Sequence, residues 1–214
     1  MIKPLDEKNL APICKQLAAA DRDLAFIFLE YGTPPLWRRE ASFATLVHII
    51  LEQQVSLASA ASAFNRLQEK LGTITPENVL SLTDEELKAC YFSRQKTLYA
   101  RELARAVSSG SLDLKALENL SDAEAKTELK KIKGIGDWTA DIYLLMALLR
   151  ADVMPKGDLA LHVAYKKLKS RALAPSSDEF QQIAEKWKPF RAVAARLLWH
   201  FYLSERKAAR QPKN

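Results

Sequence analysis

The sequence predicts an all-α fold, and three features of the residue pattern support this prediction. Apolar residues recur at three- and four-residue steps over most of the chain, and no segment has the two-residue alternation of a strand. Only six glycines interrupt the 214 residues. Helix start signals, a Ser or Thr ahead of Pro or three residues before Glu, occur at Thr75, Thr83, Ser121 and Ser176. This distribution of helix start signals and breaks predicts about ten short helices with brief connections.

Proline and glycine breaks divide the expected helices along the chain. A first helical pair ends at Pro34-Pro35, because proline lacks the N–H that an α-helix needs. A second break falls at residues 155–157, Pro-Lys-Gly. Between these breaks, apolar spacing or alanine content predicts helices within residues 46–50, 57–71, 97–107 and 142–149.

The composition excludes several classes of protein. A content of 48% apolar and 27% charged residues is that of an ordinary globular chain and not of a disordered, collagen-like or coiled-coil one. The longest apolar run, residues 142–149, is far shorter than the ~20 residues of a membrane span. Residues 1–9 carry acids where a signal peptide needs an apolar core. We therefore expect a soluble, cytosolic protein without a membrane partner.

Positive charge gathers near the C-terminus of the chain. The formal net charge is +6, and residues 186–214 alone hold eight basic side chains against the single acid Glu205. A basic segment on a near-neutral body favours a polyanionic partner, because neutralised phosphates release counterions. A solvated tail that only aids solubility is the alternative.

The strongest local motif is a helical hairpin. An amphipathic helix runs into Gly134-Ile135-Gly136, and a second apolar helix begins at once. Two glycines permit a tight turn with positive φ, and the N–H groups that open the second helix can bind a phosphate. An ordinary helix corner with glycine caps is the alternative. Three basic side chains add positive charge beside the turn: Lys130, Lys131 and Lys133.

A carboxylate follows the second break of the chain. Asp158 comes directly after Pro155-Lys156-Gly157 and precedes a helical pattern, so it is typical of a helix N-cap. A carboxylate at a helix start beside a phosphate-binding hairpin is also suited to stabilise positive charge that develops on a sugar. The sequence leaves both interpretations open.

The hairpin with the downstream Pro-x-Gly-Asp resembles the helix-hairpin-helix (HhH-GPD) DNA glycosylase superfamily. The likeness extends over residues 31–202. Three further segments are similar to the 3-methyladenine DNA glycosylase II branch in its compact form. They are residues 49–56 (IILEQQVS), 93–97 (SRQKT) with Leu103-Ala104, and 187–191 (WKPFR) with 197–199 (LLW).

The resemblance implies a fold and a partner. The fold is all-α with two packed helical lobes, a helix-hairpin-helix motif and a DNA- and base-binding cleft between the lobes. Residues 1–214 would form a single glycosylase unit: a central lobe of residues 35–150 with the hairpin at 126–145, and a terminal-helix lobe of 1–34 plus 151–214. The expected partner is double-stranded DNA that contains alkylated bases. The protein would act as a monomer, at the nucleoid of a prokaryotic cytoplasm or in a eukaryotic nucleus.

The resemblance also implies an activity. It is that of a monofunctional DNA glycosylase, which flips out an alkylated purine of the 3-methyladenine or 7-methylguanine type. The enzyme hydrolyses its N-glycosidic bond and leaves an abasic site for base excision repair. Relatives that also cut the strand carry a lysine where this chain has Trp138, so no lyase activity is expected. With only Cys14 and Cys90, no iron–sulfur cluster is expected. No cofactor would be required, although Na⁺ or K⁺ is implied at the hairpin.

The resemblance assigns roles to individual residues. Asp158 would be the catalytic carboxylate, and Gln54 would fill the vacated stack with Ser56 near the minor groove. The base pocket would contain Trp138, Trp199 and Gln53. Backbone carbonyls of Lys130, Ile132 and Ile135 would hold the monovalent cation. The phosphate-binding hairpin would consist of Lys133, Gly134, Ile135, Gly136 and Thr139.

Other interpretations remain for the whole chain and for single residues. A non-catalytic helix-hairpin-helix DNA-binding module, a mismatch or deaminated-base glycosylase and a helical protein–protein scaffold are the alternatives. His162 is expected on a helix surface, with a position facing the base pocket as the alternative, and Trp187 is expected in the core. The remaining nearby acids, Asp137, Asp141 and Asp152, are interpreted as surface or capping residues.

Overall fold

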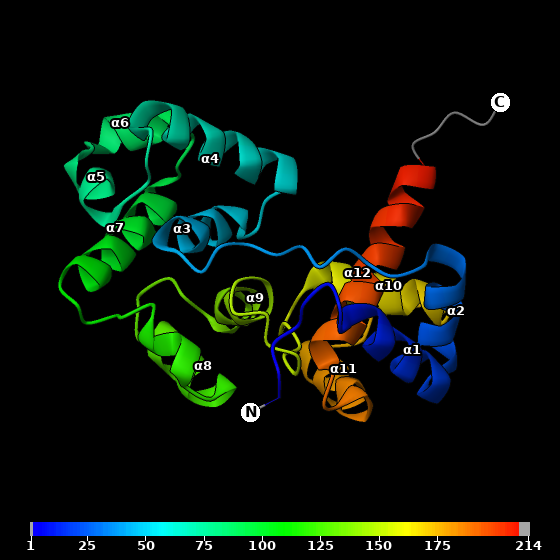
Figure 1. Ribbon diagram of the computed structural model, residues 1–214. Helices are drawn as coiled ribbons and strands as arrows, with labels where there is room; N and C mark the ends of the chain where they lie inside the picture. The colour runs from blue at the N-terminus through cyan, green and yellow to red at the C-terminus, as the bar shows by residue number, and fades with distance from the viewer. Residues whose placement is uncertain (1, 210–214) are drawn as a thin grey trace. The chain divides into compact units, whose positions relative to one another are not determined.

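The computed structural model describes residues 2–209, and every regular element in that range is a helix (Figure 1). Twelve α-helices and two short 3₁₀-helices occur there, and no strand is present among these residues. The all-α prediction is therefore confirmed. No helix within the described range is long and apolar enough to cross a membrane.

The chain divides into two compact units. Unit 1 combines both ends of the chain, up to Arg38 and from Leu149 onward, and unit 2 runs from Arg39 to Leu148. From the sequence alone these borders are expected at residues 35 and 151. The helices of unit 1 are α1 (Leu10–Ala20), α2 (Arg22–Tyr31), α10 (Leu159–Leu168), α11 (Ser177–Ala184), η2 (Glu185–Trp187) and α12 (Arg191–Ala208). Those of unit 2 are α3 (Phe43–Glu52), α4 (Leu57–Leu71), α5 (Pro76–Ser81), α6 (Asp84–Ala89), α7 (Arg94–Ser108), η1 (Ala116–Asn119), α8 (Asp122–Lys130) and α9 (Asp137–Met146).

Helix α12 is the core of unit 1, and α1, α2 and α10 pack against it. Its residues 192–199 are buried without interruption, and several of them are alanines, which allow close approach of neighbouring backbones. The guanidinium of Arg196 is fully buried and donates to the carbonyl oxygens of Leu36 and Ala192 at 3.0 and 3.1 Å. Trp187 is also buried and donates to Asp21, which caps α2. The core position expected for Trp187 is confirmed.

Four of the eight basic residues near the C-terminus are paired or buried inside unit 1. Lys186 pairs with Asp21, and Arg191 pairs with Asp152 at 2.8 Å. Lys188 pairs with Glu185, and Arg196 is buried. Arg210 and Lys213, which also contribute to the charge excess, lie outside the described residues. Arg206 and Lys207, in the last turn of α12, are exposed and pair with no acid within residues 2–209, so the positive charge of the described part stays open at that helix end.

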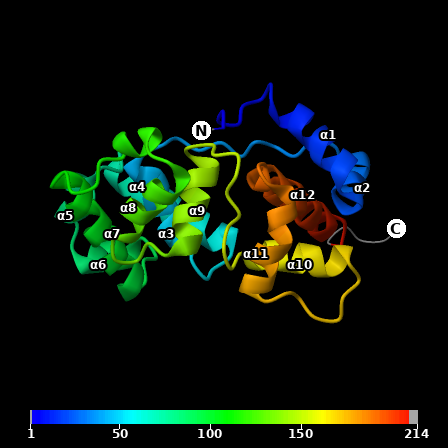
Figure 2. The same ribbon diagram turned by 90° about the horizontal axis from the view of Figure 1, so that it is seen from below.

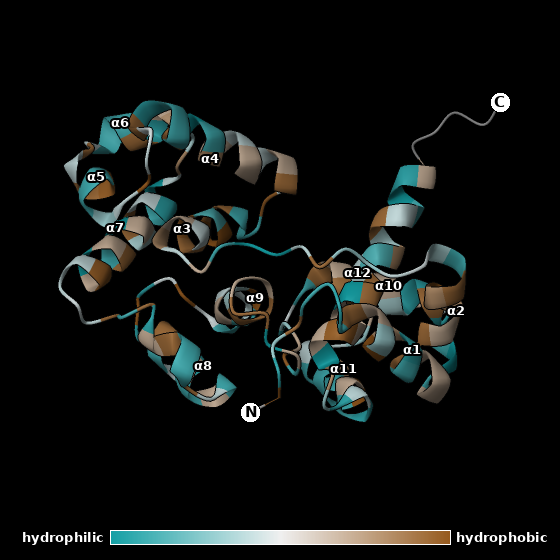
Figure 3. Cartoon of the chain, in the orientation of Figure 1, coloured by the Kyte–Doolittle hydropathy of each residue, from teal (hydrophilic) through white to brown (hydrophobic). Residues whose placement is uncertain are grey.

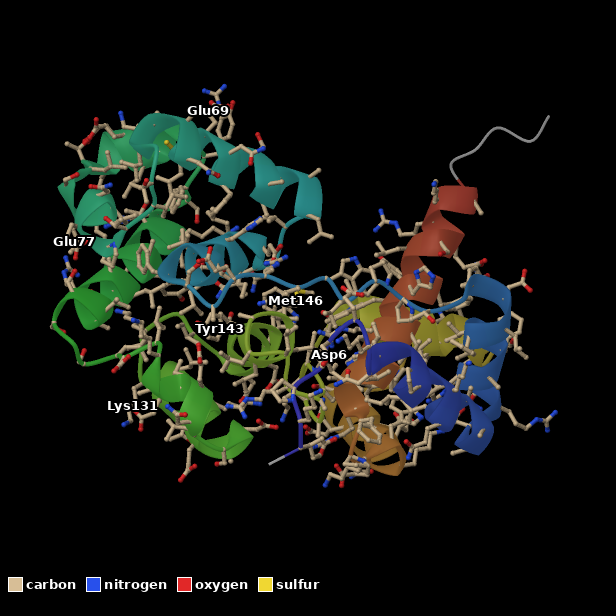
Figure 4. The ribbon with its side chains drawn as sticks, in the orientation of Figure 1. Asp6, Glu69, Glu77, Lys131, Tyr143 and Met146 are labelled. Carbon is tan, nitrogen blue, oxygen red and sulfur yellow. The ribbon has the colours of Figure 1, made fainter. Side chains whose placement is uncertain are left out.

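Helix α3 is the core of unit 2, where α4, α7 and α9 pack against it. Eight of its ten residues are buried, as expected for a helix that is apolar on all sides. Figure 2 shows α3 from below, among α4, α7 and α9. Tyr143 of α9 lies in the interior of this unit (Figure 4). By contrast, α8 is largely hydrophilic (Figure 3), and it buries only Ala125 and Leu129.

The helix starts expected from the sequence are confirmed. The side chains of Thr75 and Ser176 accept hydrogen bonds from the third residue of their helices. Thr83 and Ser121 form complete capping boxes with the glutamates three residues later. These local contacts satisfy N–H groups that would otherwise lack partners at the helix ends.

The hairpin links α8 to α9 through residues 131–136. Gly134 has φ +97°, a left-handed conformation that favours glycine, and the ring of Tyr99 lies against it. A Cβ atom added at Gly134 would be 2.1 Å from Cγ of Tyr99. Gly136 instead has φ −93°, and a Cβ added there would have no atom within 4 Å. The prediction of a positive φ is therefore confirmed for Gly134 and wrong for Gly136. Gly136 is the N-cap of α9 and has an extended backbone.

The two glycines predict opposite results for the same substitution. Gly134→Ala should lower the free energy of unfolding by about 2–4 kcal/mol, because it combines left-handed strain with a collision against Tyr99. Gly136→Ala should change it by less than about 1 kcal/mol, because the added methyl group meets open space. Urea denaturation followed by circular dichroism measures both values. Equal effects of the two substitutions would contradict the described hairpin geometry.

Candidate functional site

The loop between α3 and α4 carries the residue expected to enter the DNA stack. Gln54 is exposed and has φ +56°, an uncommon conformation for a residue with a side chain. Ser56 caps α4 by accepting a hydrogen bond from the N–H of Ser59 at 3.1 Å. The loop therefore exposes Gln54 at the surface of unit 2, between the end of α3 and the capped start of α4.

Gln53 joins this loop to the hairpin. Its side-chain Nε2 donates to the carbonyl oxygen of Gly134 and to Oγ1 of Thr139, both at 2.9 Å. Thr139 is buried, so its hydroxyl serves this contact and not an external ligand. Sequence reasoning expects Gln53 in the base pocket, whereas the structure gives its amide group two bonds that hold the hairpin.

Two further contacts brace the same loop, and sequence reasoning missed both. Arg39 forms a two-pronged ion pair with Glu52, the last residue of α3, at 2.6 and 3.0 Å. Lys96 donates from Nζ to the carbonyl oxygen of Leu51 at 2.6 Å. Burial lowers the pKa of Lys96. A glutamate within an otherwise apolar helix was the available signal, because a buried carboxylate needs a partner.

An open groove of about 600 Å³ runs over unit 2 beside these contacts. Its walls are residues 53–55 of the α3–α4 loop, residues 134–136 of the hairpin, and residues of the α6–α7 loop and of α7. The α6–α7 loop contributes Tyr91 and Ser93, and α7 contributes Gln95, Lys96 and Tyr99. The exposed Gln54 and the hairpin glycines therefore share one concave surface.

The hairpin presents backbone N–H groups and one lysine. The N-cap of α9 is Gly136, which has no side chain to cap the first turn, unlike the serines and threonines that are the N-caps of α3 to α8. Lys133 is exposed and forms no salt bridge within residues 2–209. A helix N-terminus with a nearby cation is suited to an anion such as phosphate. Of the five residues expected to bind phosphate, Ile135 and Thr139 are buried, so only their backbones can take part.

The other hairpin lysines are neutralised by acids. Lys130 pairs with Asp137 at 2.7 Å, and this bond lowers the pKa of the Asp137 carboxyl. Lys131 pairs with Glu128 and points outward from the end of α8 (Figure 4). Asp141, interpreted from the sequence as a surface or capping acid, is buried and pairs with Lys126 at 2.7 Å. That interpretation was wrong because spacing alone does not show which face of α9 the core covers.

Asp158 in unit 1 is both a cap and a buried carboxylate. It is the N-cap of α10, and its Oδ1 accepts from the N–H of Leu161 at 3.0 Å. The same oxygen accepts from the indole Nε1 of Trp199 at 3.1 Å. The side chain is 8% exposed. The N-cap interpretation is confirmed, and the indole bond adds a tertiary contact that fixes the carboxylate in place.

Trp199, which binds this carboxylate, packs against a second tryptophan of unit 1. Trp199 is buried, and its ring meets Trp37 edge-to-face at 6.3 Å between centroids. Trp37 has φ +48° and is half-buried. Sequence reasoning missed Trp37, although a tryptophan two residues after the Pro34-Pro35 break was a signal. In unit 2, Trp138 is the second residue of α9 and is half-buried, at the start of the helix as expected.

His162 is buried, which corrects the helix-surface position expected from the sequence. It lies one turn after Asp158 in α10, with its ring 4.9 Å from that of Phe180. Burial lowers the pKa of His162, although Asp158 opposes the shift. The histidine is therefore part of the packing beneath the carboxylate.

Residues 2–209 contain no cluster of three or more His, Cys, Asp or Glu suited to a metal, and the cation expected at the hairpin would be held by backbone carbonyls. Among the three expected carbonyls, that of Ile132 accepts from the N–H of Ile135 at 3.0 Å within the turn. A carbonyl oxygen has a second lone pair, so this bond is compatible with ligation. The cation site stays a prediction.

Comparison with known proteins places the chain in a family. Residues 47–190 match the family described as HhH-GPD superfamily base excision DNA repair protein. DNA-3-methyladenine glycosylase 1 of Schizosaccharomyces pombe is 32% identical over 165 residues, which are 75% of this chain and 72% of that protein. The Bacillus subtilis protein YfjP is 27% identical over 184 residues, and the match spans 82% of this chain but 64% of YfjP.

A solved structure has the same fold. The 3-methyladenine DNA glycosylase of Schizosaccharomyces pombe in complex with abasic DNA superposes with a TM-score of 0.82 at 27% identity. The superposition covers 94% of this chain and 100% of that one. The match to the family extends over more than half of the chain, from α3 to the start of α12. The chain therefore belongs to the HhH-GPD superfamily of base excision DNA repair proteins.

Proposed function

We propose that the protein is a DNA glycosylase that releases alkylated purines, of the 3-methyladenine and 7-methylguanine type, from double-stranded DNA. The observation that carries this proposal is Asp158, a buried carboxylate held by the N–H of Leu161 and the indole of Trp199. The family membership and the two Schizosaccharomyces pombe comparisons support it. A helix cap needs only the bond from Leu161, and the second bond from the distant indole of Trp199 orients the carboxylate beyond that need.

DNA would be anchored through its backbone at the hairpin of unit 2. The uncapped start of α9 offers N–H groups, and Lys133 adds positive charge. Phosphate contacts of this kind fix orientation without reading sequence. Gln54, exposed on the neighbouring loop, would fill the place of the flipped nucleotide, and Ser56 would lie near the minor groove. A side chain in that place would offset the cost of unstacking a base, which is on the order of a few kcal/mol.

The chemistry requires stabilisation of positive charge on the sugar. When the C1′–N bond breaks, its electron pair moves to the alkylated base and cancels the positive charge of that base. The sugar becomes an oxocarbenium-like cation, to which a water oxygen bonds with loss of a proton. The carboxylate of Asp158 would stabilise this cation. The ring of Trp199, bonded to Asp158 in unit 1, would attract the cationic base before cleavage, a gain of about 1–2 kcal/mol where water is excluded. Trp138 of unit 2 stays a predicted residue of the base pocket.

We further propose that the enzyme is monofunctional, without lyase activity. It would act as a monomer in the compartment of the cell that contains the DNA. Trp138 occupies the position where strand-cleaving relatives carry a lysine, and an indole cannot form a Schiff base with the sugar. Catalysis would need no redox cofactor. A sodium or potassium ion at the carbonyls of Lys130, Ile132 and Ile135 would only help to hold a phosphate.

Removal of the Asp158 charge should separate chemistry from folding. In Asp158→Asn the amide oxygen can still accept from Leu161 and Trp199, so the melting temperature should change little. Single-turnover release of 3-methyladenine should fall about 100- to 1000-fold, because the charge opposite the sugar cation is lost. Affinity for an abasic-analogue duplex should remain within a few-fold. Release within a few-fold of the unmodified protein would exclude Asp158 as the catalytic carboxylate.

Two matched variants control this experiment. Asp178→Asn makes the same chemical change at an exposed carboxylate of unit 1 and should leave release unchanged. Trp199→Phe keeps an aromatic ring but removes the indole donor to Asp158. Its release rate should fall between those of Asp158→Asn and the unmodified protein, because the carboxylate would be less firmly held.

Gly136→Ala tests the phosphate anchor. The added methyl group projects into open space at the start of α9, so it should displace a phosphate without disturbing the fold. Affinity for damaged and undamaged duplexes should fall alike, by about ten-fold, which is the weight of one charge-assisted hydrogen bond. Fluorescence anisotropy over a salt series measures this effect. A loss confined to the damaged duplex would contradict a phosphate-anchoring role.

Product analysis tests the absence of lyase activity. The enzyme should leave intact abasic strands that break only after alkali, and borohydride should trap no protein–DNA adduct. A covalent adduct would show that an amine attacks the sugar. Lys96 would then be the first residue to examine, because burial lowers its pKa and enlarges its neutral, nucleophilic fraction.

A further inference from the structure

Unit 1 has a concave surface of its own, and none of the residues that line it belongs to the candidate functional site. It is a cleft of about 380 Å³ between α2, α10 and α12. Helices α2 and α10 both pack against α12 (Figure 1). Three aromatic rings line the cleft, those of Phe26, Tyr31 and Phe201, with centroids 5.7 to 6.5 Å apart in edge-to-face contacts. We call this surface the aromatic cleft.

The ring of Phe26 is open to solvent at this cleft. Phe26 is 49% exposed, and Leu29, on the same face of α2, is 84% exposed. Exposed apolar side chains that adjoin a concave surface are typical of a site that binds a partner. An aromatic side chain of such a partner would lose its contact with water between Phe26 and Phe201 and would extend the edge-to-face packing of the rings.

The acids that line the cleft are paired within unit 1. Glu205 accepts a hydrogen bond from the hydroxyl of Tyr31 at 2.8 Å and pairs with Lys167. The bonds from Lys167 and Tyr31 lower the pKa of the Glu205 carboxyl, so this group stays ionised. Asp23 pairs with Lys169 at 2.5 Å. Both carboxylates are therefore neutralised by lysines at the end of α10.

Positive charge predominates around the cleft, because α10 and α12 both end beside it with basic last turns. Arg206 donates to the hydroxyl of Tyr202 at 2.9 Å, and neither Arg206, Lys207 nor Lys166 pairs with an acid within residues 2–209. An aromatic cleft with a positive surround is complementary to an acidic segment that carries an apolar anchor. The basic side chains are Lys166, Lys167, Lys169, Arg206 and Lys207, against the acids Asp23, Glu30 and Glu205.

We propose that the aromatic cleft binds an acidic peptide segment of a partner protein, with one aromatic side chain of that segment between Phe26 and Phe201. Flanking carboxylates of the segment would pair with Lys166 and Arg206. The inference goes beyond the proposed glycosylase function and does not rest on it. A DNA strand fits this surface less well, because its phosphates would meet apolar rings and the two carboxylates of the lining.

The cleft is separate from the candidate catalytic carboxylate. Asp158 is the N-cap of α10, whereas Lys167 and Leu168 lie at the opposite end of that helix. At a rise of about 1.5 Å per residue, the two ends of α10 are roughly 15 Å apart. A peptide in the cleft would therefore not cover Asp158.

Binding of a synthetic peptide tests the proposal. The probe is a fluorescein-labelled peptide with aspartates and glutamates on both sides of one phenylalanine, and fluorescence anisotropy measures its affinity for the full chain. Replacement of this phenylalanine by alanine, or of the acids by their amides, should weaken binding at least about ten-fold, because each change removes one part of the complementarity. Phe26→Ala should weaken binding of the original peptide by a similar factor.

Charge reversal gives a second test that changes only surface side chains and so preserves the fold. The double variant Lys166→Glu with Arg206→Glu should lower the affinity for the acidic peptide about ten-fold. It should also raise the affinity for a peptide in which lysines replace the acids. The matched control, Lys8→Glu with Lys15→Glu, changes the net charge by the same amount outside the cleft and should leave both affinities nearly unchanged.

Several results would overturn the inference. They are a lack of binding to the acidic peptide, equal binding of its alanine or amide forms, and equal effects of the two double variants. If a single-stranded oligonucleotide displaced the peptide and Phe26→Ala weakened both ligands, the cleft would be a nucleic acid surface and the inference would be wrong. Release of 3-methyladenine should be the same in all these variants and tests the proposed function separately, so the two failures are distinguishable.

Discussion

The carboxamide of Gln53 is the contact on which the candidate DNA-binding surface of unit 2 depends. Its two hydrogen bonds, to Gly134 and Thr139, connect segments more than eighty residues apart in the sequence. They tie the loop that exposes Gln54 to the hairpin whose N–H groups suit a phosphate. The packing of α9 against α3 brings the two features together, and the bridge fixes their spacing for one strand of DNA. A binding surface gains affinity when its parts are held in position before the ligand arrives.

In unit 1, a single charged group is likewise held in position before a ligand arrives. Asp158 is fixed by a bond from its own helix and by one from a distant indole, so its carboxylate is oriented before any sugar cation forms. Electrostatic stabilisation is most effective when the protein dipoles need not reorganise during the reaction. Strained backbone accompanies these features in both units, at Trp37 beside Trp199 and at Gln54 and Tyr91 on the groove. Each of these residues places a large or polar side chain at a position that glycine would occupy more easily.

Local patterns predicted local structure well, and tertiary contacts account for the errors. The caps at Thr83 and Ser121 were predictable because each involves residues three positions apart. The cap at Asp158 was predictable for the same reason, but its bond to Trp199 joins residues 41 positions apart. Burial of Asp141 and His162 depends on which helix faces the core covers, and the pairing of Lys130 depends on Asp137 across the turn. Gly136 looked equivalent to Gly134 in the motif, yet only Gly134 has the left-handed backbone and the aromatic neighbour that require glycine.

The central claim is that the negative charge of Asp158 stabilises positive charge on the deoxyribose. Its most direct test compares two duplexes that differ in one charge at the lesion position. One carries a protonated pyrrolidine in place of the sugar, as an analogue of the cation, and the other carries neutral tetrahydrofuran. The account predicts that the unmodified protein binds the cationic duplex at least about 100-fold more tightly, as transition-state analogues are bound. It also predicts that Asp158→Asn loses most of this preference without losing affinity for the neutral duplex. An equal preference in the two proteins would contradict the account.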